Sequence, residues 1–431
     1  MAYPTFDKKG CVSYHARTMA NIPLEAWDKE RLKENLSHRV KGGFGAFWVA
    51  GSRPTEPPPV RPIVLTGGIP DPDALPVEEL IEASNTVLRR EGQEALRYGG
   101  HQGHPGLREW LAEETRRREG LDVSADNFTI TNGISGALIN VSETFLNEGE
   151  VGLVELPTFP GGSGAIQNCL CDIVGVTVDA EGLVPEALEE NIERLEGEGR
   201  NVKLLYTVPN FQNPTGTTLT VERRERVVEI CQAHEVVIAE DDAYGDVRFE
   251  GEKPPSLFAI ARGKGVVFMG SFSKTMATGL RIGWTLAEQE VTDALLQTRF
   301  DLGVSPWVQR TILEFASNGM LEKHLEKVNA IYKRKRDAML AALDERCSRY
   351  ATWTRPEGGY FIWLTLAETV DAKKLAEAAR EQGVAYVGGY AFHIDGTGQN
   401  TIRLAYSFAN EDEIPEGIMR LGRALEQASQ S

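Results

Sequence analysis

The residue types that could do chemistry lie in seven short segments between residues 98 and 403. They read Y-G-G-H-Q-G-H-P-G-L-R from Tyr98, T-N-G-I-S-G-A-L from Thr131, E-L-P-T-F-P-G from Glu155, V-P-N-F-Q-N-P-T-G ending at Gly216, E-D-D-A-Y from Glu240, S-F-S-K-T-x-x-x-G-L-R-I-G from Ser271 and T-I-R-L from Thr401. Lys274 follows a predicted buried strand, and Arg281 lies further along the same segment. A lysine in a pocket with other cations has a lowered pKa, which suits it to form a Schiff base.

Several common motifs are absent from the sequence, among them H-E-x-x-H, G-x-x-x-x-G-K-[ST] and paired C-x-x-C. The glycine cluster Gly161-Gly162-Ser163-Gly164 lacks the dinucleotide-binding spacing, and we expect turns there. His101 and His104 have neither the spacing nor the partners of metal ligands, so they are predicted to be loop residues. No metal site is expected.

Short apolar runs alternate with amphipathic ones from about residue 60 to about residue 315. The strand-sized runs are Val151–Leu156, Asp172–Val178, Val202–Val208, Val236–Glu240, Val266–Gly270 and Ile282–Leu286. Several are apolar almost throughout, as strands buried on both faces must be. Helical segments such as Val221–His234 lie between them. This alternation predicts an α/β fold with a large domain, residues 61–315, whose mostly parallel sheet is covered by helices.

A smaller α+β domain is predicted for residues 316–431. Its long first helix is expected from about Leu321 to Cys347, because apolar residues there keep one buried face. The remaining elements are expected at Gly359–Leu366, Asp371–Gln382, Thr401–Ser407 and Glu411–Gln427. Residues 1–60 are predicted to be an N-terminal arm and linker, since glycines and prolines interrupt them.

Composition and charge narrow the possible partners. With 63 acidic and 46 basic side chains, the 431 residues carry a formal net charge of -17. Such a surface repels nucleic acid and anionic membranes, so neither is expected as a partner. The 5 cysteines are scattered, which does not predict a disulfide framework. With no signal peptide and no long apolar run, the cytoplasm is the expected location.

All the segments, in this order, resemble class I aminotransferases of the aminoadipate and kynurenine aminotransferase type, over roughly residues 60 to 425. The resemblance implies a fold-type I enzyme with pyridoxal 5'-phosphate (PLP) as its cofactor. It assigns to Lys274 the Schiff base with PLP. Once substrate has replaced that amine, the same amine can move a proton between the substrate's Cα and the cofactor.

The resemblance assigns further residues to the cofactor's ring. Asp241 matches the aspartate that keeps the ring nitrogen protonated. Asp242 is the competing choice, because successive strand residues face opposite sides and only one can point at the ring. Asn213 and Tyr244 match the residues that hydrogen-bond the phenolic oxygen, and Phe159 takes the place of the stacking ring.

A phosphate dianion calls for a helix N-terminus and fixed donors. Ile134 and Ser135 lie at the start of a predicted helix and match the phosphate loop, while Ser271 and Arg281 match its hydroxyl and guanidinium. Tyr98 matches a tyrosine that reaches the phosphate from the neighbouring subunit. The resemblance therefore implies a homodimer with shared active sites.

Arg403 matches the arginine that binds the substrate's α-carboxylate, with Asn213 also at the substrate. A planar guanidinium can donate to both carboxylate oxygens, although an arginine in a strand could equally form a structural ion pair.

The sequence departs from the family pattern at several positions: Ile134, Ser135, Phe159, Ala243 and Gly388. Phe159 lacks the usual tyrosine hydroxyl, and Ala243 and Gly388 replace prolines. In the arm, Gly45-Ala46-Phe47-Trp48 stands where many relatives carry I-R, which favours an apolar or aromatic substrate group over a second carboxylate.

Two classes of function remain open from the sequence, a PLP enzyme and a non-enzyme. Among the enzyme reactions, the favoured one is PLP-dependent transfer of an amino group between an amino acid and a 2-oxo acid. Elimination, substitution, cyclisation or decarboxylation would use the same lysine, aspartate and arginine. The non-enzyme alternative is a DNA-binding regulator, since this fold also occurs fused to winged-helix domains, but the chain is acidic and its first 60 residues are interrupted by glycine and proline.

Overall fold

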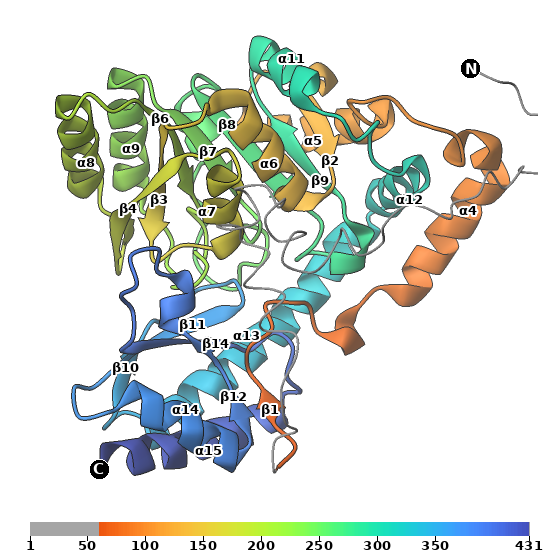
Figure 1. Cartoon of the computed structure of the whole chain (residues 1–431). Helices are drawn as coiled ribbons and strands as arrows, with labels where there is room; N and C mark the ends of the chain where they lie inside the picture. Colours follow the sequence, from red (N-terminus) through yellow and green to blue (C-terminus); the bar gives the residue numbers. More distant parts are fainter. Residues whose placement is uncertain (1–59, 431) are drawn as a thin grey trace, which may run out of the picture.

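The computed structural model describes residues 60–430, so the predicted arm and its aromatic stretch lie outside the described residues. The strands of the large sheet are β2 (Phe128–Thr131), β3 (Val151–Leu156), β4 (Asp172–Asp179), β5 (Gly182–Leu183), β6 (Val202–Thr207), β7 (Val237–Asp241), β8 (Val266–Ser271) and β9 (Gly283–Leu286). The helices before residue 320 are α4 (Val77–Ala95), α5 (Pro105–Glu119), α6 (Gly133–Phe145), α7 (Pro160–Gln167), α8 (Pro185–Gly197), α9 (Val221–Ala233), α10 (Leu257–Ile260), α11 (Gln289–Thr298) and α12 (Pro306–Ser317) (Figure 1).

The large sheet has eight strands in the order β2-β9-β8-β7-β6-β3-β4-β5. Strands β8, β7, β6, β3 and β4 pair in parallel, while β9 and β5 run antiparallel to their neighbours. The predicted strands are confirmed here, each within one residue of its expected ends. The predicted α/β fold with a mostly parallel sheet is therefore confirmed.

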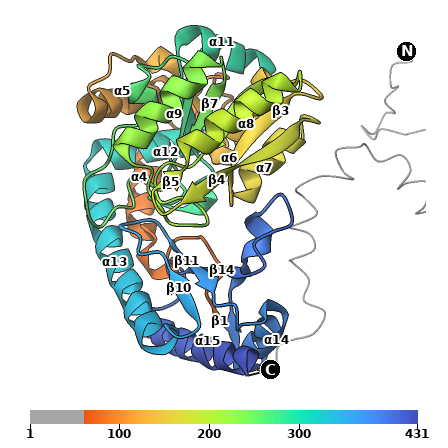
Figure 2. The ribbon, with the colours of Figure 1, turned by 90° about the vertical axis from the view of Figure 1, so that its left-hand side faces the viewer.

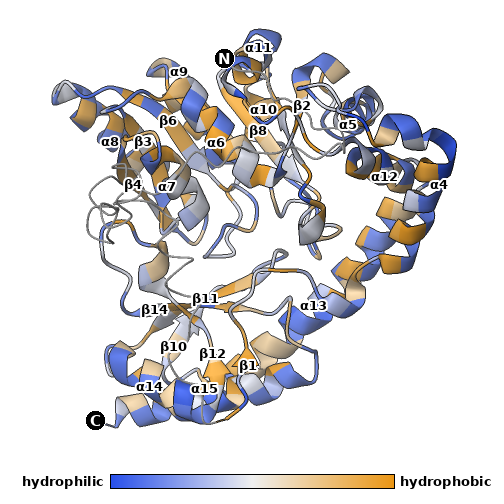
Figure 3. Cartoon of the chain, turned by 45° about the vertical axis from the view of Figure 1, so that its right-hand side comes forward, coloured by the Kyte–Doolittle hydropathy of each residue, from blue (hydrophilic) through white to orange (hydrophobic). Residues whose placement is uncertain are grey.

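Both faces of this sheet are buried by helices. Leu204 and Ala239 belong to a core that includes residues of α6 and α7. Their chain neighbours Leu205 and Ile238 belong to a second core that includes residues of α8 and α9. Successive strand residues thus face opposite layers, which is why these strands are apolar throughout. In Figure 3 the hydrophobic colour follows the strands between the helices.

The C-terminal part is built on a four-stranded antiparallel sheet. Its strands are β10 (Ala351–Trp353), β11 (Phe361–Leu366), β13 (Val387–Gly388) and β14 (Thr401–Ala405), in the order β10-β11-β14-β13. Its helices are α13 (Met320–Arg346), α14 (Ala372–Gln382) and α15 (Glu413–Ser429). Figure 2 shows α13 running from the large part to α15. The predicted elements here are confirmed to within two residues of their ends.

The first described strand joins the C-terminal part rather than the large sheet. β1 (Ile63–Val64) pairs in parallel with β12 (Val384–Ala385). The Leu65 N–H donates to the Ala385 carbonyl at 2.8 Å, and the Leu65 carbonyl accepts from Ala405 at 2.8 Å. The division between residues 61–315 and 316–431 stays a prediction.

The expected turns at the glycine cluster are wrong, because Gly161-Gly162-Ser163-Gly164 lies inside α7. Pro160 occupies the first turn, where its missing N–H costs no hydrogen bond. Two aromatic rings explain the glycines. A Cβ at Gly161 would lie 2.3 Å from Phe159 Cε1, and one at Gly162 would lie 2.0 Å from Tyr206 Cε1. The helix therefore needs residues without side chains to approach these rings.

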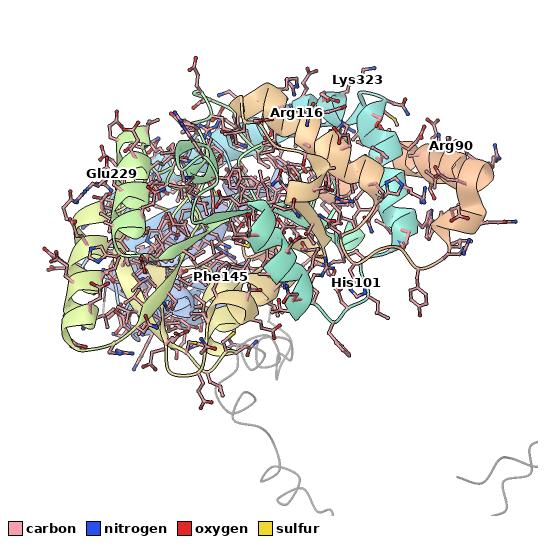
Figure 4. The ribbon with its side chains drawn as sticks, turned by 90° about the horizontal axis from the view of Figure 1, so that it is seen from above. Arg90, His101, Arg116, Phe145, Glu229 and Lys323 are labelled. Carbon is pink, nitrogen blue, oxygen red and sulfur yellow. The ribbon has the colours of Figure 1, made fainter. Side chains whose placement is uncertain are left out.

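Charged side chains occupy the outer faces of the helices. Figure 4 shows this for Arg90 on α4, Glu229 on α9 and Lys323 on α13, all of them exposed. Among the described residues, none of the helices is both long enough and apolar enough to cross a membrane.

Candidate active site

The polar residues predicted to act on the cofactor meet at one edge of the large sheet. Asp241 ends β7, Lys274 follows the end of β8, and Asn213 lies in the loop after β6. These three strands are parallel neighbours, so their carboxyl ends lie side by side. Open α/β sheets generally bind their ligands at this edge.

The Lys274 side chain lies in a buried pocket with aromatic walls. Its Nζ donates to the Gly68 carbonyl at 2.6 Å and lies 5.7 Å and 5.9 Å from the ring centroids of Tyr244 and Tyr360. Burial and the positive charge of Arg403 lower the pKa of Lys274 to about 8. A larger fraction of this amine is therefore uncharged near neutral pH than in an exposed lysine, and the uncharged amine is the nucleophile.

Asp241 and Asp242 point to opposite sides of the end of β7. Asp241 Oδ2 accepts from the Tyr206 hydroxyl at 2.8 Å, and burial raises the pKa of Asp241 to about 6. Asp242 instead accepts from Asn210 Nδ2 at 2.7 Å and from Lys253 Nζ at 2.9 Å. Of the two aspartates, Asp241 is the one on the side of the Lys274 amine.

Arg403 is held from several directions in the middle of β14. Its Nη1 donates to Asn213 Oδ1 at 2.7 Å and its Nη2 to the Thr66 carbonyl at 2.8 Å. The guanidinium lies between two rings, 4.2 Å from the centroid of Phe361 and 4.7 Å from that of Phe392. No acidic side chain among residues 60–430 pairs with Arg403. A structural ion pair, the alternative left open by the sequence, is therefore not formed within the described chain.

An anion-binding arrangement lies at the start of α6. The first N–H groups of a helix have no partner within the helix, and Asn132, which precedes Gly133, provides no side-chain cap. Arg281 Nη2 donates to the Asn132 carbonyl at 3.2 Å and would lie 2.8 Å from a Cβ at Gly133. The Ile134 side chain belongs to the core, whereas Ser135 is exposed. At Ile134 only the backbone N–H remains to bind an anion.

Ser271 ends β8 beside this helix start. Its hydroxyl accepts from the Ser273 N–H at 3.0 Å and lies 3.2 Å from the Ile282 carbonyl. Two aromatic residues predicted at the cofactor, Tyr244 and Phe159, are not equally buried. Tyr244 is buried, with its ring edge-on to Phe361 at 5.7 Å between centroids, and Phe159 precedes α7, half-buried.

Tyr98 is not brought to this cluster within the chain. Its side chain is 90% exposed between α4 and α5, where it lines a hollow of about 650 Å³ together with Leu96, Leu302 and Trp307.

The two histidines near Tyr98 in sequence, His101 and His104, do not occupy equivalent positions. His104 caps α5 by accepting from the Leu107 N–H at 3.3 Å, so it is not purely a loop residue. Within residues 60–430, no group of three His, Cys, Asp or Glu side chains is arranged to hold a metal ion.

Sequence reasoning missed several residues that touch this site: Thr66, Gly68, Tyr206, Phe361 and Phe392. The two carbonyls at Thr66 and Gly68 leave no trace in residue type. Residue type does not reveal Tyr206 either, because its place beside Asp241 follows from strand pairing. Tyr206 pairs with Ala239 in the sheet, and Asp241 lies two residues beyond Ala239 on the same face.

This donor set fits PLP. The amine of Lys274, the carboxylate of Asp241 and the helix start beside Arg281 would meet an aldehyde, a ring nitrogen and a phosphate. The Arg403 Nε is buried with no hydrogen-bond partner among the described residues, so this guanidinium has unused capacity for an anion.

Comparisons with known proteins agree with this geometry. The sequence profile described as "Aminotransferase class I and II" matches residues 62–421. The chain belongs to this family. Aromatic-amino-acid aminotransferase 1 of Thermococcus litoralis is 38% identical over 367 residues, which cover 85% of this chain and 88% of that one. The 2-aminoadipate transaminase of Thermus thermophilus is 36% identical, with coverages of 85% and 91%.

A solved structure shares the fold. The kynurenine aminotransferase of Pyrococcus horikoshii, crystallised in complex with PMP, superposes with a TM-score of 0.83 at 32% identity, covering 94% of this chain and 98% of that one. As an aminotransferase, the chain uses PLP to transfer an amino group between an amino acid and a 2-oxo acid. Of the two reaction classes left open by the sequence, amino-group transfer is therefore the confirmed one.

Proposed function

We propose that Lys274 is the covalent attachment point of PLP and the group that moves a proton at the substrate's Cα. Bound PLP supplies an electron sink that side chains lack. Asp241 keeps the ring nitrogen protonated, while Asn213 and Tyr244 lie at the phenolic oxygen and Phe159 at the ring face. The observation that carries this assignment is the half-buried Lys274 amine, which lies among aromatic rings within the electrostatic reach of Asp241 and has its pKa lowered to about 8.

The two anions of the reaction are bound at opposite ends of this pocket. The cofactor's phosphate is bound by the backbone N–H groups of Ile134 and Ser135 at the start of α6, with Ser271 and Arg281. The substrate's α-carboxylate is bound by Arg403. Asn213 and Thr66 already fix its guanidinium, so less conformational freedom is lost on binding.

Borohydride reduction of the holoenzyme tests the attachment point. Reduction fixes PLP to its lysine, and peptide mass spectrometry should find one PLP per chain, on Lys274. The Lys274→Ala variant should take up none. Lys333→Ala, which removes an exposed lysine paired with Glu250, should label normally. Stoichiometric label on another lysine in Lys274→Ala would contradict the assignment.

The active site is shared between two copies of the chain. Apolar and aromatic side chains are exposed around the hollow at Tyr98, with Phe300 98%, Leu96 70% and Leu302 55% exposed. Such a group on one face is typical of a protein–protein contact. A second copy covering it would bring Tyr98 to the partner's phosphate.

Complementation between inactive variants tests the shared site. Tyr98→Phe and Lys274→Ala, each inactive alone, should recover part of the activity in a purified heterodimer, because one of its two sites then has both residues. A Phe300→Asp variant should be monomeric by light scattering, whereas Val221→Asp, on the exposed face of α9, should not change the assembly. A heterodimer without recovered activity would contradict a shared site.

The amino donor carries an apolar or aromatic side chain. Phe361 and Phe392 flank Arg403, and the relatives include an aromatic-amino-acid and a kynurenine aminotransferase. A spectral screen of amino acids against the holoenzyme should give the largest kcat/KM with aromatic donors. A preference for 2-aminoadipate or glutamate would place a second cation in the site and contradict this substrate class.

A further inference from the structure

We infer that Tyr206 is a positioning residue for Asp241 and that its hydroxyl, together with the backbone N–H of Ala243, clamps both oxygens of that carboxylate. The inference rests on the role proposed above for Asp241 at the cofactor's ring nitrogen. It adds two donors, neither of which is expected to touch the substrate.

The register of the sheet places the tyrosine beside the aspartate. Tyr206 on β6 pairs with Ala239 on β7, and Asp241 is the diagonal neighbour two residues on. The hydroxyl donates to Asp241 Oδ2 at 2.8 Å, and the Ala243 N–H donates to Oδ1 at 3.1 Å. Tyr206 is 1% and Asp241 3% exposed, so water does not compete with these bonds.

The clamp leaves each oxygen of the carboxylate free to accept a further donor. Each carboxylate oxygen can accept about two hydrogen bonds, and each oxygen of Asp241 has one donor among residues 60–430. Both donors are neutral, so they fix the plane of the carboxylate without cancelling its charge. A charged ring N–H can then be met by a carboxylate of fixed orientation.

Helix α7 holds the ring of Tyr206 in place. A Cβ at Gly162 would lie 2.0 Å from Tyr206 Cε1 and 2.4 Å from Cδ1. The helix backbone therefore packs directly on the ring, and a phenylalanine would fill the same space. This makes removal of the hydroxyl alone a clean experiment.

Other titratable groups surround Asp241. Asp242 follows it just beyond the end of β7, Lys274 lies near it after the end of β8, and Glu155 on β3 and Tyr244 lie near the Tyr206–Asp241 pair. Burial raises the pKa of Glu155 to about 7, but its carboxylate is bonded elsewhere, to Thr207 at 2.6 Å and to Gln212 at 3.0 Å. A pH experiment must therefore isolate Asp241.

The experiment measures PLP dissociation from the apoprotein between pH 5 and pH 9. Affinity should increase as Asp241 ionises. In Tyr206→Phe the ionised form loses a donor, so the midpoint should move up by about one pH unit. Affinity should then fall about twofold at pH 7 and about tenfold near pH 5, where Asp241 is mostly protonated in both proteins. The matched control is Tyr406→Phe, whose equally buried hydroxyl donates to the Gly358 and Gly359 carbonyls at 2.9 and 2.8 Å. Its midpoint should stay that of the wild type.

A second pair of variants tests the other half of the clamp. Ala243→Pro removes the N–H and should move the midpoint in the same direction, while Ala243→Gly keeps the N–H and should not. In an Asp241→Asn background neither Tyr206→Phe nor Ala243→Pro should shift the midpoint further. Any pH dependence that remains in the Asp241→Asn background comes from other titrating groups, such as Glu155, Lys274 or the phosphate.

The outcomes distinguish the two proposals. If Asp241→Asn keeps the wild-type pH dependence, the role of Asp241 fails. If Asp241→Asn loses the wild-type pH dependence but the midpoint of Tyr206→Phe, like that of Tyr406→Phe, does not move, only the clamp fails. A Tyr206→Phe chain that does not fold while Tyr406→Phe does would also overturn the clamp, because the hydroxyl would then serve folding.

Discussion

Two neighbouring carboxylates at the end of β7 lie in opposite kinds of surroundings. Asp241 has neutral hydrogen-bond donors, from Tyr206 and the Ala243 N–H, and burial raises its pKa to about 6. Asp242, on the other side, accepts from Lys253, which also bonds Asp246 at 3.3 Å. We call Asp242, Asp246, Lys253 and Arg118 the ion-pair cluster; Arg118 donates to Asp246 at 2.8 Å.

The difference separates the carboxylate that we propose to act on the cofactor from carboxylates that are already paired. In the ion-pair cluster, Lys253 and Arg118 more than offset the effect of burial and lower the pKa of Asp246 to about 2. The negative charge of Asp246 is therefore kept at neutral pH and is already paired with Lys253 and Arg118. Asp241 has no ion-pair partner among residues 60–430, so a cationic ring nitrogen can still gain from its charge.

The largest expected effect separates the two neighbours by activity. Asp241→Asn should lower kcat by at least about 100-fold, because an amide cannot balance a charge at the ring nitrogen. Asp242→Asn should retain near-normal kcat and instead lower the free energy of unfolding by about 2 kcal/mol. Steady-state kinetics and urea unfolding measure both. Equal losses of kcat would abolish the distinction.

The next effect concerns the packing behind Asp241. Gly162→Ala should destabilise the protein by about 2 kcal/mol and weaken PLP binding, because its Cβ would collide with the Tyr206 ring. Gly197→Ala in α8 is the control. A Cβ there meets nothing within 4 Å, so this variant should be neutral or slightly stabilising. Thermal unfolding of the two variant apoproteins measures the change in stability. A Gly162→Ala variant as stable as the wild type would mean that the Tyr206 ring is free to move.

The two carboxylates should also affect apoprotein stability with opposite signs of pH dependence. Asp241 has a folded pKa of about 6, above the ordinary value of 3.8, so its presence costs stability as pH rises between these values. Asp246 has a folded pKa of about 2, below 3.8, so it stabilises above pH 4 and loses this effect as pH falls.

Urea unfolding at several pH values tests these signs. Relative to the wild-type apoprotein, Asp241→Asn should gain stability from pH 4 to pH 7. Asp246→Asn should lose stability at pH 7 but approach the wild type near pH 2. The same sign in both variants would contradict the contrast drawn here.

The smallest effect tests whether charge acts across the strand. Lys253→Met removes the cation shared by Asp242 and Asp246. Because Lys253 bonds the opposite side of β7, kcat of the folded variant should stay within about twofold of the wild type. A tenfold change would mean that the ion-pair cluster tunes Asp241 through space.

The sequence predicted the sheet well because its strands are apolar on both faces and bounded by turn residues. The choice of Asp241 over Asp242 came from the family pattern and stays a prediction, although in the structure it is Asp242 and not Asp241 that bonds Lys253. The clamp by Tyr206 was missed, since it depends on which strands are neighbours, and β6 and β7 are joined by a helix whose position single-residue patterns do not give. Turns were wrongly predicted at the α7 glycines. These positions need glycine because two aromatic rings pack against the helix, and one of the rings comes from a distant strand.

The short stretch around β1 sets a practical limit on engineering. Within a few residues it pairs with β12, and the Thr66 and Gly68 carbonyls accept from Arg403 and Lys274. A label, affinity tag or inserted domain placed between residues 63 and 68 would therefore alter both side chains at once, although the stretch is far from them in sequence. Fusion joints therefore belong outside residues 63–68, for example after α15.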